Sequence, residues 1–360
     1  MVSLGSSVLV PSVQELATRH KNTVPSRYLR PHQDPPAIDV SLPSIPIIDM
    51  NKLRLQQSSA DELERLHSAC KEWGFFQLIN HGVSSSLIDK MKTDMKDLFN
   101  LPLEEKKKYW QQADDLEGFG NAFVQSEEQK LDWGDMFFLT TLPNSLRKPR
   151  LFDHLPSSFR ETMEAYSMEL QSLAMTVFGL MSRALGVKGD ELNELFDGGF
   201  QSLRLNCYPP CPQPESVVGL SPHSDGGGLT ILLQANEMEG LQVKKEGLWV
   251  PVKPLPNAFV INIGDSLEII TNGVYPSIEH RGMVNSTRER LSIAAFHNPK
   301  MTAEIGPLRS LISPENPALF RRVGAEKFHK DLFARKLKGK AFVDSMRVGH
   351  EEGSAAVATD

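Results

Sequence analysis

Three residues of the chain have the types and the spacing of a metal site. His223 and Asp225 lie at i and i+2 beside a predicted strand, GLTILLQ, and such side chains point to the same side of an extended chain. His280 lies in a second predicted strand, SIEHRGMV. Two imidazoles and one carboxylate on one face form the facial triad that binds non-haem Fe(II) and leaves other positions open for substrates. Zinc can bind the same groups, so these residues predict a metal site without choosing the metal.

A second pair of residues is suited to bind a carboxylate. Arg290-Leu-Ser292 follows the last expected ligand and again places two side chains on one side of a strand. A guanidinium beside a hydroxyl makes a charge-assisted clamp for a carboxylate. Taken alone, Arg290 is better explained as a solvated hairpin charge, because it follows Arg288 and Glu289. Together with the three metal-ligand candidates, the carboxylate clamp is the favoured interpretation.

Most of the other histidines have ordinary explanations. Their sequence contexts are turns, polar stretches or a predicted helix, which favour surface or capping roles over metal binding. The histidines interpreted in this way are His20, His32, His67, His81, His154, His329 and His350.

A β-rich region must position the candidate site. Between about Phe200 and Asn298, short apolar segments alternate with Gly, Pro and Asn, which is typical of an antiparallel sandwich or barrel, the jelly roll being one form. The segments are LRLNCY, GLTILLQ, GLQVKK, LWVPV, AFVINIG, SIEHRGMV and RLSIAAF.

Helices are expected on both sides of this region. The pattern predicts helices from about Ser59 to Gly74, with a strand FFQLINHG after it, and from about Ser84 to Phe99. The longest helix is expected from Ser158, where Ser158 and Glu161 would form a capping box, to Gly186. Before them, the proline-rich stretch 24–50 predicts an extended arm, and a helical tail is expected over 317–348.

The composition excludes several classes of protein. Hydrophobic residues make up 40% and charged residues 23% of the 360 residues, which is typical of a folded globular chain. A net charge of −6 gives no global basic field for nucleic acid or an anionic membrane. Three cysteines without a CxxC pair favour a reducing compartment. With neither a signal peptide nor a membrane span recognisable, we expect a cytoplasmic protein, a monomer, acting on a small molecule.

Several motifs together resemble the plant 2-oxoglutarate- and Fe(II)-dependent dioxygenases. They are ACKEWGFFQLINHG, NCYPPCPQPE, GLSPHSD, WVPVKPLPNAFVINIGDSLEIITNG and HRGMVNSTRERLSIAAFHNP. Within that family the chain is most similar to the senescence-related-gene-type proteins and the opium-poppy alkaloid O-demethylases. The resemblance implies a mainly β fold with a helical shell, namely a double-stranded β-helix (jelly-roll) core with an α-helical N-terminal region. We expect an N-terminal arm over 1–43, the helical region over 44–197, the jelly-roll core over 198–300, and C-terminal helices with a flexible tail over 301–360.

The resemblance also implies roles for individual residues. His223, Asp225 and His280 would bind Fe(II), and Arg290, Ser292, Tyr208 and Asn206 would bind the cosubstrate 2-oxoglutarate. Oxygen is the second cosubstrate, and ascorbate is expected to help. The substrate positions would be Met136, Phe138 and Phe296, while Asn298 replaces the acid of flavonoid-binding relatives and puts flavonoid chemistry in doubt.

The activity expected from these roles is hydroxylation or O-demethylation of a small aromatic plant metabolite of the alkaloid, phenylpropanoid or coumarin type, with formation of succinate and CO2. Two alternatives stay open. One is a non-catalytic binding protein on the same scaffold, which would form no succinate with any substrate. The other is a zinc hydrolase, which gives no reason for Arg290 and Ser292.

Overall fold

Two β-sheets carry the candidate site residues. The computed structural model describes residues 8–19, 22–30, 44–55, 59–112, 115–121, 124, 126–187, 191–334 and 339–349. The larger sheet has eight strands in the order β1-β2-β10-β7-β12-β5-β4-β3. Their bounds are β1 Ile47–Asp49, β2 Phe75–Ile79, β3 Gly118–Gly120, β4 Asp135–Leu142, β5 Gln201–Tyr208, β7 Leu229–Gln234, β10 Phe259–Ile263 and β12 Arg290–His297.

The smaller sheet has four strands in the order β6-β11-β8-β9. Their bounds are β6 Leu220–His223, β8 Leu241–Lys245, β9 Leu248–Pro251 and β11 His280–Gly282. The core strands β5 to β12 alternate between the two sheets except at the β8–β9 hairpin, which lies within the smaller sheet. This is the jelly-roll arrangement, so the expected fold class is confirmed, and the closed barrel is not formed. A further pair, β13 Glu304–Ile305 and β14 Val323–Gly324, lies outside both sheets.

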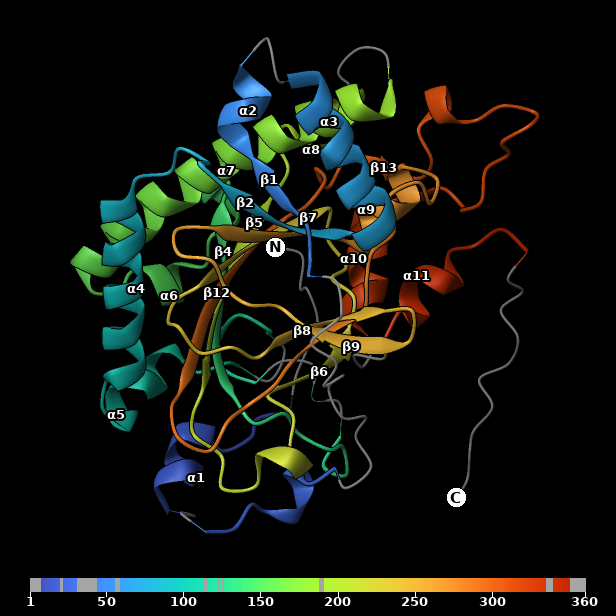
Figure 1. Cartoon of the computed structure of the whole chain (residues 1–360). Helices are drawn as coiled ribbons and strands as arrows, with labels where there is room; N and C mark the ends of the chain where they lie inside the picture. Colours follow the sequence, from blue (N-terminus) through green and yellow to red (C-terminus); the bar gives the residue numbers. More distant parts are fainter. Residues whose placement is uncertain are drawn as a thin grey trace.

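Helices cover one face of the larger sheet, with α4 and α7 beside β4 and β12 (Figure 1). The long helix α7 packs on β4, β7 and β12, and α3 and α4 pack on α7. The helix bounds are α1 Val13–Arg19, α2 Met50–Arg54, α3 Ser59–Ser68, α4 Ser85–Asn100, α5 Leu103–Lys106, α6 Pro149–Phe152, α7 Ser157–Leu185, α8 Glu191–Phe196, α9 Asp265–Ile270, α10 Ala325–Phe333 and α11 Ala341–Ser345.

Alternation along the strands separates the helix-packed core from the site. In β12, Leu291, Ile293 and Ala295 belong to the main hydrophobic core, which also contains the buried side chains of α4 and α7. Arg290 and Ser292, which occupy alternate positions of the same strand, line a cavity on the other face of the sheet. Because successive side chains of a strand point to opposite faces, one strand both anchors the helical layer and presents polar groups to the site.

Three sequence expectations need correction. The capping box at Ser158 is absent, because α7 begins at Ser157 after Pro156 and Ser158 instead accepts a hydrogen bond from Lys90. The tail is not helical from residue 317, since β14 and a preceding irregular stretch come before α10. His223 lies in a strand of its own, β6, rather than at the start of the strand that contains GLTILLQ. The expected ends at Gly74 and Gly186 are confirmed, with φ values of 57° and 66° that favour glycine.

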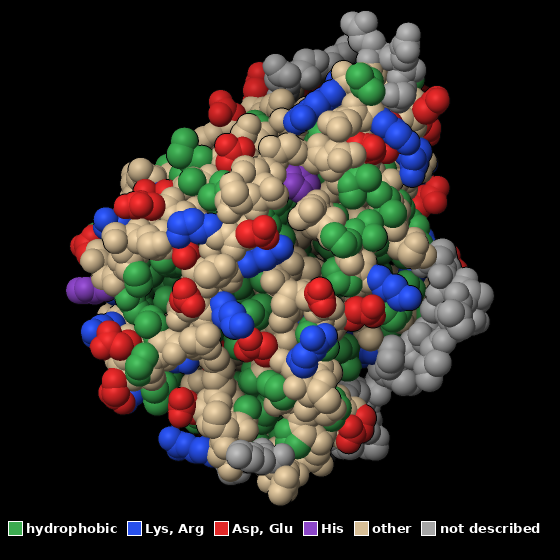
Figure 2. Space-filling model, turned by 60° about the vertical axis from the view of Figure 1, so that its left-hand side comes forward, with side chains coloured by type: hydrophobic (Ala, Val, Ile, Leu, Met, Phe, Trp, Pro, Cys, Tyr) green, Lys and Arg blue, Asp and Glu red, His purple; other side chains and the backbone are tan. Residues whose placement is uncertain are grey.

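The surface carries charges of both signs. Figure 2 shows Lys and Arg side chains interspersed with Asp and Glu over one face. That face therefore presents no continuous field of one sign. Among the described residues, no helix is both long and apolar enough to span a bilayer.

Candidate metal centre and substrate pocket

His223, Asp225 and His280 lie together between the two sheets. Possible ligand atoms of the three residues all lie within 4.8 Å of one another, and each side chain is buried. Asp225 Oδ1 is 3.5 Å from Nε2 of His223 and 3.7 Å from Nε2 of His280. The two imidazole rings are 4.3 Å apart between centroids. The arrangement therefore offers one oxygen and two nitrogen donors to a single ion.

Backbone pairing brings the two histidines together. β6 and β11 are antiparallel neighbours, and His223 pairs directly with His280. Asp225 follows β6 in the turn that leads to β7, where its backbone carbonyl accepts a hydrogen bond from the Asp265 amide at the start of α9. The ligand positions are thus fixed by β6, by the turn that follows it and by β11. Strand pairing brings the two histidines together although they are far apart in the sequence.

Hydrogen bonds orient the ligand atoms. Nδ1 of His223 lies 2.8 Å from the Ser221 carbonyl oxygen, and Nδ1 of His280 lies 3.1 Å from that of Ile278. Because a carbonyl can only accept, both Nδ1 atoms carry the proton and both Nε2 lone pairs are left for a metal. On the carboxylate, Asp225 Oδ2 accepts hydrogen bonds from Thr230 and Asn262, which leaves Oδ1 facing the imidazoles.

The electrostatics of the centre keep Asp225 and His280 in their metal-binding protonation states. Burial alone would raise the pKa of Asp225, but the imidazoles of His280 and His223 and the Thr230 hydroxyl outweigh it and hold the pKa well below its usual range. Burial lowers the pKa of His280 to about 4, with a further contribution from His223. The centre thus consists of a carboxylate and neutral imidazole, the donor set of non-haem iron sites, and it fits Fe(II).

The cosubstrate residues of the sequence prediction line one cavity next to this centre. Arg290, Ser292, Asn206 and Tyr208 come from the paired strands β12 and β5, in which Arg290 lies opposite Tyr208 and Ser292 opposite Asn206. Arg290 is only 3% exposed, so its interpretation as a solvated hairpin charge is wrong.

Several polar atoms of this cavity are left without partners. Arg290 donates from Nη2 to Gln234 at 2.6 Å, whereas its buried Nε has no partner in the described part of the chain. Asn206 Oδ1, and Nε2 of the Gln234 that accepts from Arg290 beside the cavity, are buried and unpartnered in the same sense. Unpaired buried donors and acceptors are costly, so the cavity is suited to a polar ligand, and a carboxylate complements the guanidinium.

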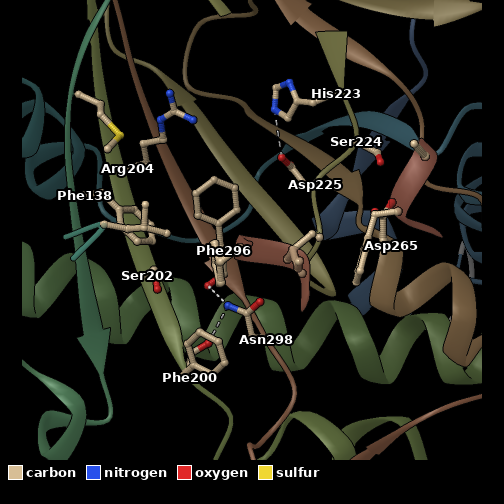
Figure 3. Close-up of a pocket in the computed structure, with 18 of the residues that line it drawn as sticks. Phe138, Phe200, Ser202, Arg204, His223, Ser224, Asp225, Asp265, Phe296 and Asn298 are labelled. Carbon is tan, nitrogen blue, oxygen red and sulfur yellow. Dashed lines mark hydrogen bonds and ion pairs between the residues drawn. The ribbon is translucent and has the colours of Figure 1, made fainter. Parts of the chain in front are cut away.

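A larger and more apolar pocket opens on the metal ligands. It measures about 1040 Å³, its open mouth included. Met136 and Phe138 of β4 and Phe296 of β12 line it, as do His223 and Asp225. In Figure 3 the ring of Phe296 lies between Phe138 and the side where His223 and Asp225 stand. The structure therefore places all three predicted substrate positions at the metal centre. Asn298 also lines the pocket, and its amide donates to the Phe200 carbonyl.

Sequence reasoning missed two parts of this pocket. Arg204 lines both cavities, and its Nε is buried without a partner among the described residues. The signal was available, because Arg204 is two positions before Asn206 in a strand and so shares its face. The second part is a C-terminal wall formed by Leu332, Phe333, Gly339, Ala341 and Phe342, for which no local pattern exists.

Comparison with known proteins identifies the family. The model for the 2OG-Fe(II) oxygenase superfamily matches residues 199–299, and the model for the N-terminal region of non-haem dioxygenases in morphine synthesis matches residues 45–157. Protein SRG1 of Arabidopsis thaliana is 56% identical over 349 residues, which cover 95% of this chain and 98% of that protein. The chain belongs to the 2OG-Fe(II) oxygenase superfamily.

Further members of the superfamily are nearly as similar. An oxoglutarate-dependent flavonoid 7-O-demethylase of Ocimum basilicum is 54% identical, covering 96% of this chain and 93% of the relative. Codeine O-demethylase of Papaver somniferum is 50% identical, covering 97% and 99%. The crystal structure of JOX2 with 2OG, Fe and JA superposes with a TM-score of 0.86 at 37% identity, covering 94% of this chain and 98% of JOX2. The expected enzyme class, a 2-oxoglutarate-dependent dioxygenase, is confirmed, and the family implies Fe(II), 2-oxoglutarate and O2.

Proposed function

We propose that this oxygenase hydroxylates or O-demethylates a small, flat aromatic plant metabolite of the alkaloid, phenylpropanoid or coumarin type, with its metal held by His223, Asp225 and His280. The observation that carries the proposal is the meeting of an apolar, aromatic-walled pocket with the buried triad. A small polar acid would leave most of that apolar wall in contact with water, whereas an aromatic ring system would cover it.

Removal of an O-methyl group is the favoured form of the reaction. Two of the relatives are named as O-demethylases, one for a flavonoid and one for codeine. Attack on an O-methyl carbon gives a hemiacetal, which releases formaldehyde and a hydroxyl group. Attack on a ring or alkyl carbon would instead leave a hydroxylated product.

Arg204 indicates which functional group the substrate carries on one side. Its guanidinium stands where the substrate pocket meets the cosubstrate cavity, and its strand neighbours in register are Phe138 and Ala294, neither of which is an acid. The Arg204 side chain is half-buried and no carboxylate pairs with it among the described residues, so it favours an oxygen acceptor on the ligand. We therefore expect a carbonyl, phenolic or carboxylate oxygen on the side of the substrate that faces β5.

The protein's share of the reaction is binding, orientation and exclusion of water. With iron and 2-oxoglutarate bound, the centre supplies oxidation of a C–H bond by O2, coupled to decarboxylation of 2-oxoglutarate to succinate and CO2. Arg290 and Ser292 would hold the distal carboxylate of 2-oxoglutarate, with Tyr208 and Asn206 beside it. Phe296 and Phe138 would hold the substrate so that one carbon lies next to the triad. No proton transfer by a side chain is needed, and we expect ascorbate to sustain turnover by keeping iron reduced.

Product mass distinguishes the reactions. Purified protein with Fe(II), 2-oxoglutarate and ascorbate is incubated with methoxylated alkaloids, phenylpropanoids, coumarins and flavones, and both succinate and product mass are followed. Loss of about 14 mass units with formaldehyde supports O-demethylation, and gain of about 16 indicates hydroxylation. Efficient turnover of a small aliphatic acid, with none of the aromatic compounds accepted, would contradict the proposed substrate class.

A further inference from the structure

The C-terminal segment forms one wall of the substrate pocket. Segment 339–349 contributes Gly339, Ala341 and Phe342 to the lining, and α10 contributes Leu332 and Phe333. The Phe342 ring packs on Phe328 of α10 with centroids 4.9 Å apart. The same residues are absent from the lining of the cosubstrate cavity. Displacement of segment 339–349 would therefore open the substrate pocket without removing any residue from the lining of the 2-oxoglutarate cavity.

One buried carboxylate ties this segment to the body of the protein. Glu268 of α9 is 2% exposed, and its Oε2 accepts a hydrogen bond from Lys340 Nζ at 2.6 Å. Lys340 also donates to the Ser277 carbonyl at 2.6 Å, and Arg347 lies 3.4 Å from Glu268 Oε1. Two cations on either side of α11 thus converge on one carboxylate.

The partners of Glu268 make it a rigid anchor. The backbone amide and the hydroxyl of Ser277 donate to Glu268 Oε2 at 2.7 Å and 2.8 Å. A buried carboxylate with several donors around it is held in one position, and a charged pair in this setting is coupled more strongly than one in water. Loss of the Lys340 charge leaves the buried Glu268 carboxylate with Arg347, at 3.4 Å, as its remaining cation.

Backbone contacts bring the anchored segment against the metal-ligand strand. The amide of Gly339 donates to the Pro222 carbonyl at 3.2 Å, and the amide of Ser224 donates to the Gly339 carbonyl at 3.3 Å. Gly339 and His223 form an isolated β-bridge. Lys340 is the next residue after this bridge, so its ion pair with Glu268 holds the bridge in place.

We propose that Glu268 is a positioning residue whose ion pair with Lys340 holds segment 339–349 as the outer wall of the substrate pocket. This inference rests on the proposed function only in assigning the larger pocket to the substrate. Its consequence is that the pair controls substrate affinity and the coupling of 2-oxoglutarate consumption to substrate oxidation, without touching either molecule.

The test uses Lys340→Met, which keeps the length of the side chain and removes its charge. Its matched control is Lys327→Met, which removes a lysine from an exposed ion pair with Asp331 on the neighbouring α10. Hydrogen exchange of segment 339–349 and binding of 7-methoxycoumarin and of 2-oxoglutarate are measured on the full-length protein. For Lys340→Met we expect about tenfold faster exchange and about tenfold weaker coumarin binding, with 2-oxoglutarate binding within about twofold of wild type.

Further variants separate positioning from general loss of structure. Lys340→Arg should restore exchange and binding, because the cation is retained. Glu268→Gln combined with Lys340→Met should be no worse than the more affected single variant, since both remove the same interaction. In steady state the singles should raise the substrate KM more than they lower kcat, and should increase succinate formed per product.

Wild-type exchange and coumarin affinity in Lys340→Met would overturn the proposal, as would equal effects of Lys327→Met. Weaker 2-oxoglutarate binding with unchanged coumarin binding would also overturn it. If the wild type does not bind 7-methoxycoumarin at all, the proposed substrate class fails for that compound. The exchange measurement then decides separately whether Glu268 and Lys340 hold the segment.

Discussion

The two carboxylate oxygens of Asp225 have different environments. Oδ2 is taken by Thr230 and Asn262, and Oδ1 faces the two imidazoles. Asp225→Glu should therefore abolish turnover, because an added methylene moves the oxygen by more than the roughly 0.5 Å that such sites tolerate. His223→Ala and His280→Ala should do the same by removing a ligand. Iron content, succinate formation and thermal unfolding are the measurements. Full activity with iron bound in any of the three would contradict the assignment of the triad.

Arg290 sets the affinity for 2-oxoglutarate if its guanidinium binds a carboxylate. Lysine keeps the charge but loses the planar fork, so Arg290→Lys should raise the KM for 2-oxoglutarate by roughly ten- to a hundredfold, or about 1.5 to 3 kcal/mol. Ser292→Ala should have a smaller effect, since it removes one hydrogen bond from an uncharged hydroxyl donor. Titration of the rate against 2-oxoglutarate measures both. An unchanged KM in Arg290→Lys would assign the side chain a purely structural role.

Phe296 stands where the substrate pocket meets the cosubstrate cavity. Its half-buried side chain lines both, but Arg290 and Ser292, which would bind the 2-oxoglutarate carboxylate, lie earlier on the same strand face and line only the cosubstrate cavity. Phe296→Ala should weaken substrate binding by about 1 to 3 kcal/mol through lost stacking and burial, with little change in the KM for 2-oxoglutarate. Both constants are measured with one aromatic substrate. An effect confined to the cosubstrate would refute this role for Phe296.

Residue types and spacing predicted part of this site. His223 and Asp225 were recognisable because two-residue spacing has a fixed meaning on an extended chain, and Arg290 and Ser292 for the same reason. Arg204 obeys the same alternation but has no motif of its own. Glu268 and Lys340 could not be paired from the sequence, because the ion pair depends on the tertiary packing of α11 near α9.

At the scale of elements, the turn after β10 controls how the Asp225 segment is placed. An added Cβ at Gly264 would lie 2.2 Å from the Gly227 carbonyl oxygen and 3.0 Å from that of Asp225. Backbone atoms cannot move aside as a flexible side chain can, so Gly264→Ala should destabilise the fold by roughly 1 to 3 kcal/mol and weaken iron binding. Gly324→Ala is the control, since nothing lies within 4 Å of its added Cβ.

Urea unfolding and iron titration of both glycine variants give the comparison. Equal stability and iron affinity in Gly264→Ala and Gly324→Ala would show that the Asp225 turn can shift without loss of either property.

The sequence was least informative about where the strands begin and end. Periodicity indicated most strands of the core, whereas β6 has too few residues for a pattern and was not predicted as a strand.

At the scale of the whole molecule, the layered architecture follows from two sequence patterns. Apolar residues alternate along the strands and repeat at helical spacing along the helices. The main core contains the buried faces of α3, α4 and α7 together with one face of the larger sheet. That division into a helical layer and two sheets was predictable, because each element must bury its apolar face. The C-terminal wall of the pocket was not predictable, since α10 and α11 are short and their positions depend on contacts with distant parts of the chain. One such contact joins Leu332 of α10 to Gly226, where an added Cβ would meet the Leu332 side chain.

The buried side chain of His329 makes the stability of the fold depend on pH. The sequence context favoured a surface or capping role, and that interpretation is wrong, because the imidazole is 1% exposed and packs against Phe200, Phe328 and Phe333. Neither ring nitrogen has a partner among the described residues. Burial lowers the pKa of His329 from 6.5 to about 4. Between these pH values the unfolded chain binds a proton that the folded chain does not, so this residue lowers the free energy of unfolding as the pH falls.

His329→Phe should remove that contribution. The phenyl ring suits the aromatic surroundings, and the variant's advantage over wild type should grow by about 2 kcal/mol between pH 7 and pH 5, since each proton is worth about 1.4 kcal/mol per pH unit. Urea unfolding at several pH values measures it, with His154→Asn at an exposed position as the control for loss of one imidazole. Comparing each variant with wild type cancels the contributions of other buried groups, among them His297, whose pKa burial lowers to about 3. Parallel stability curves for wild type and His329→Phe would show that His329 is protonated alike in the folded and unfolded chain, against the burial seen in the structure.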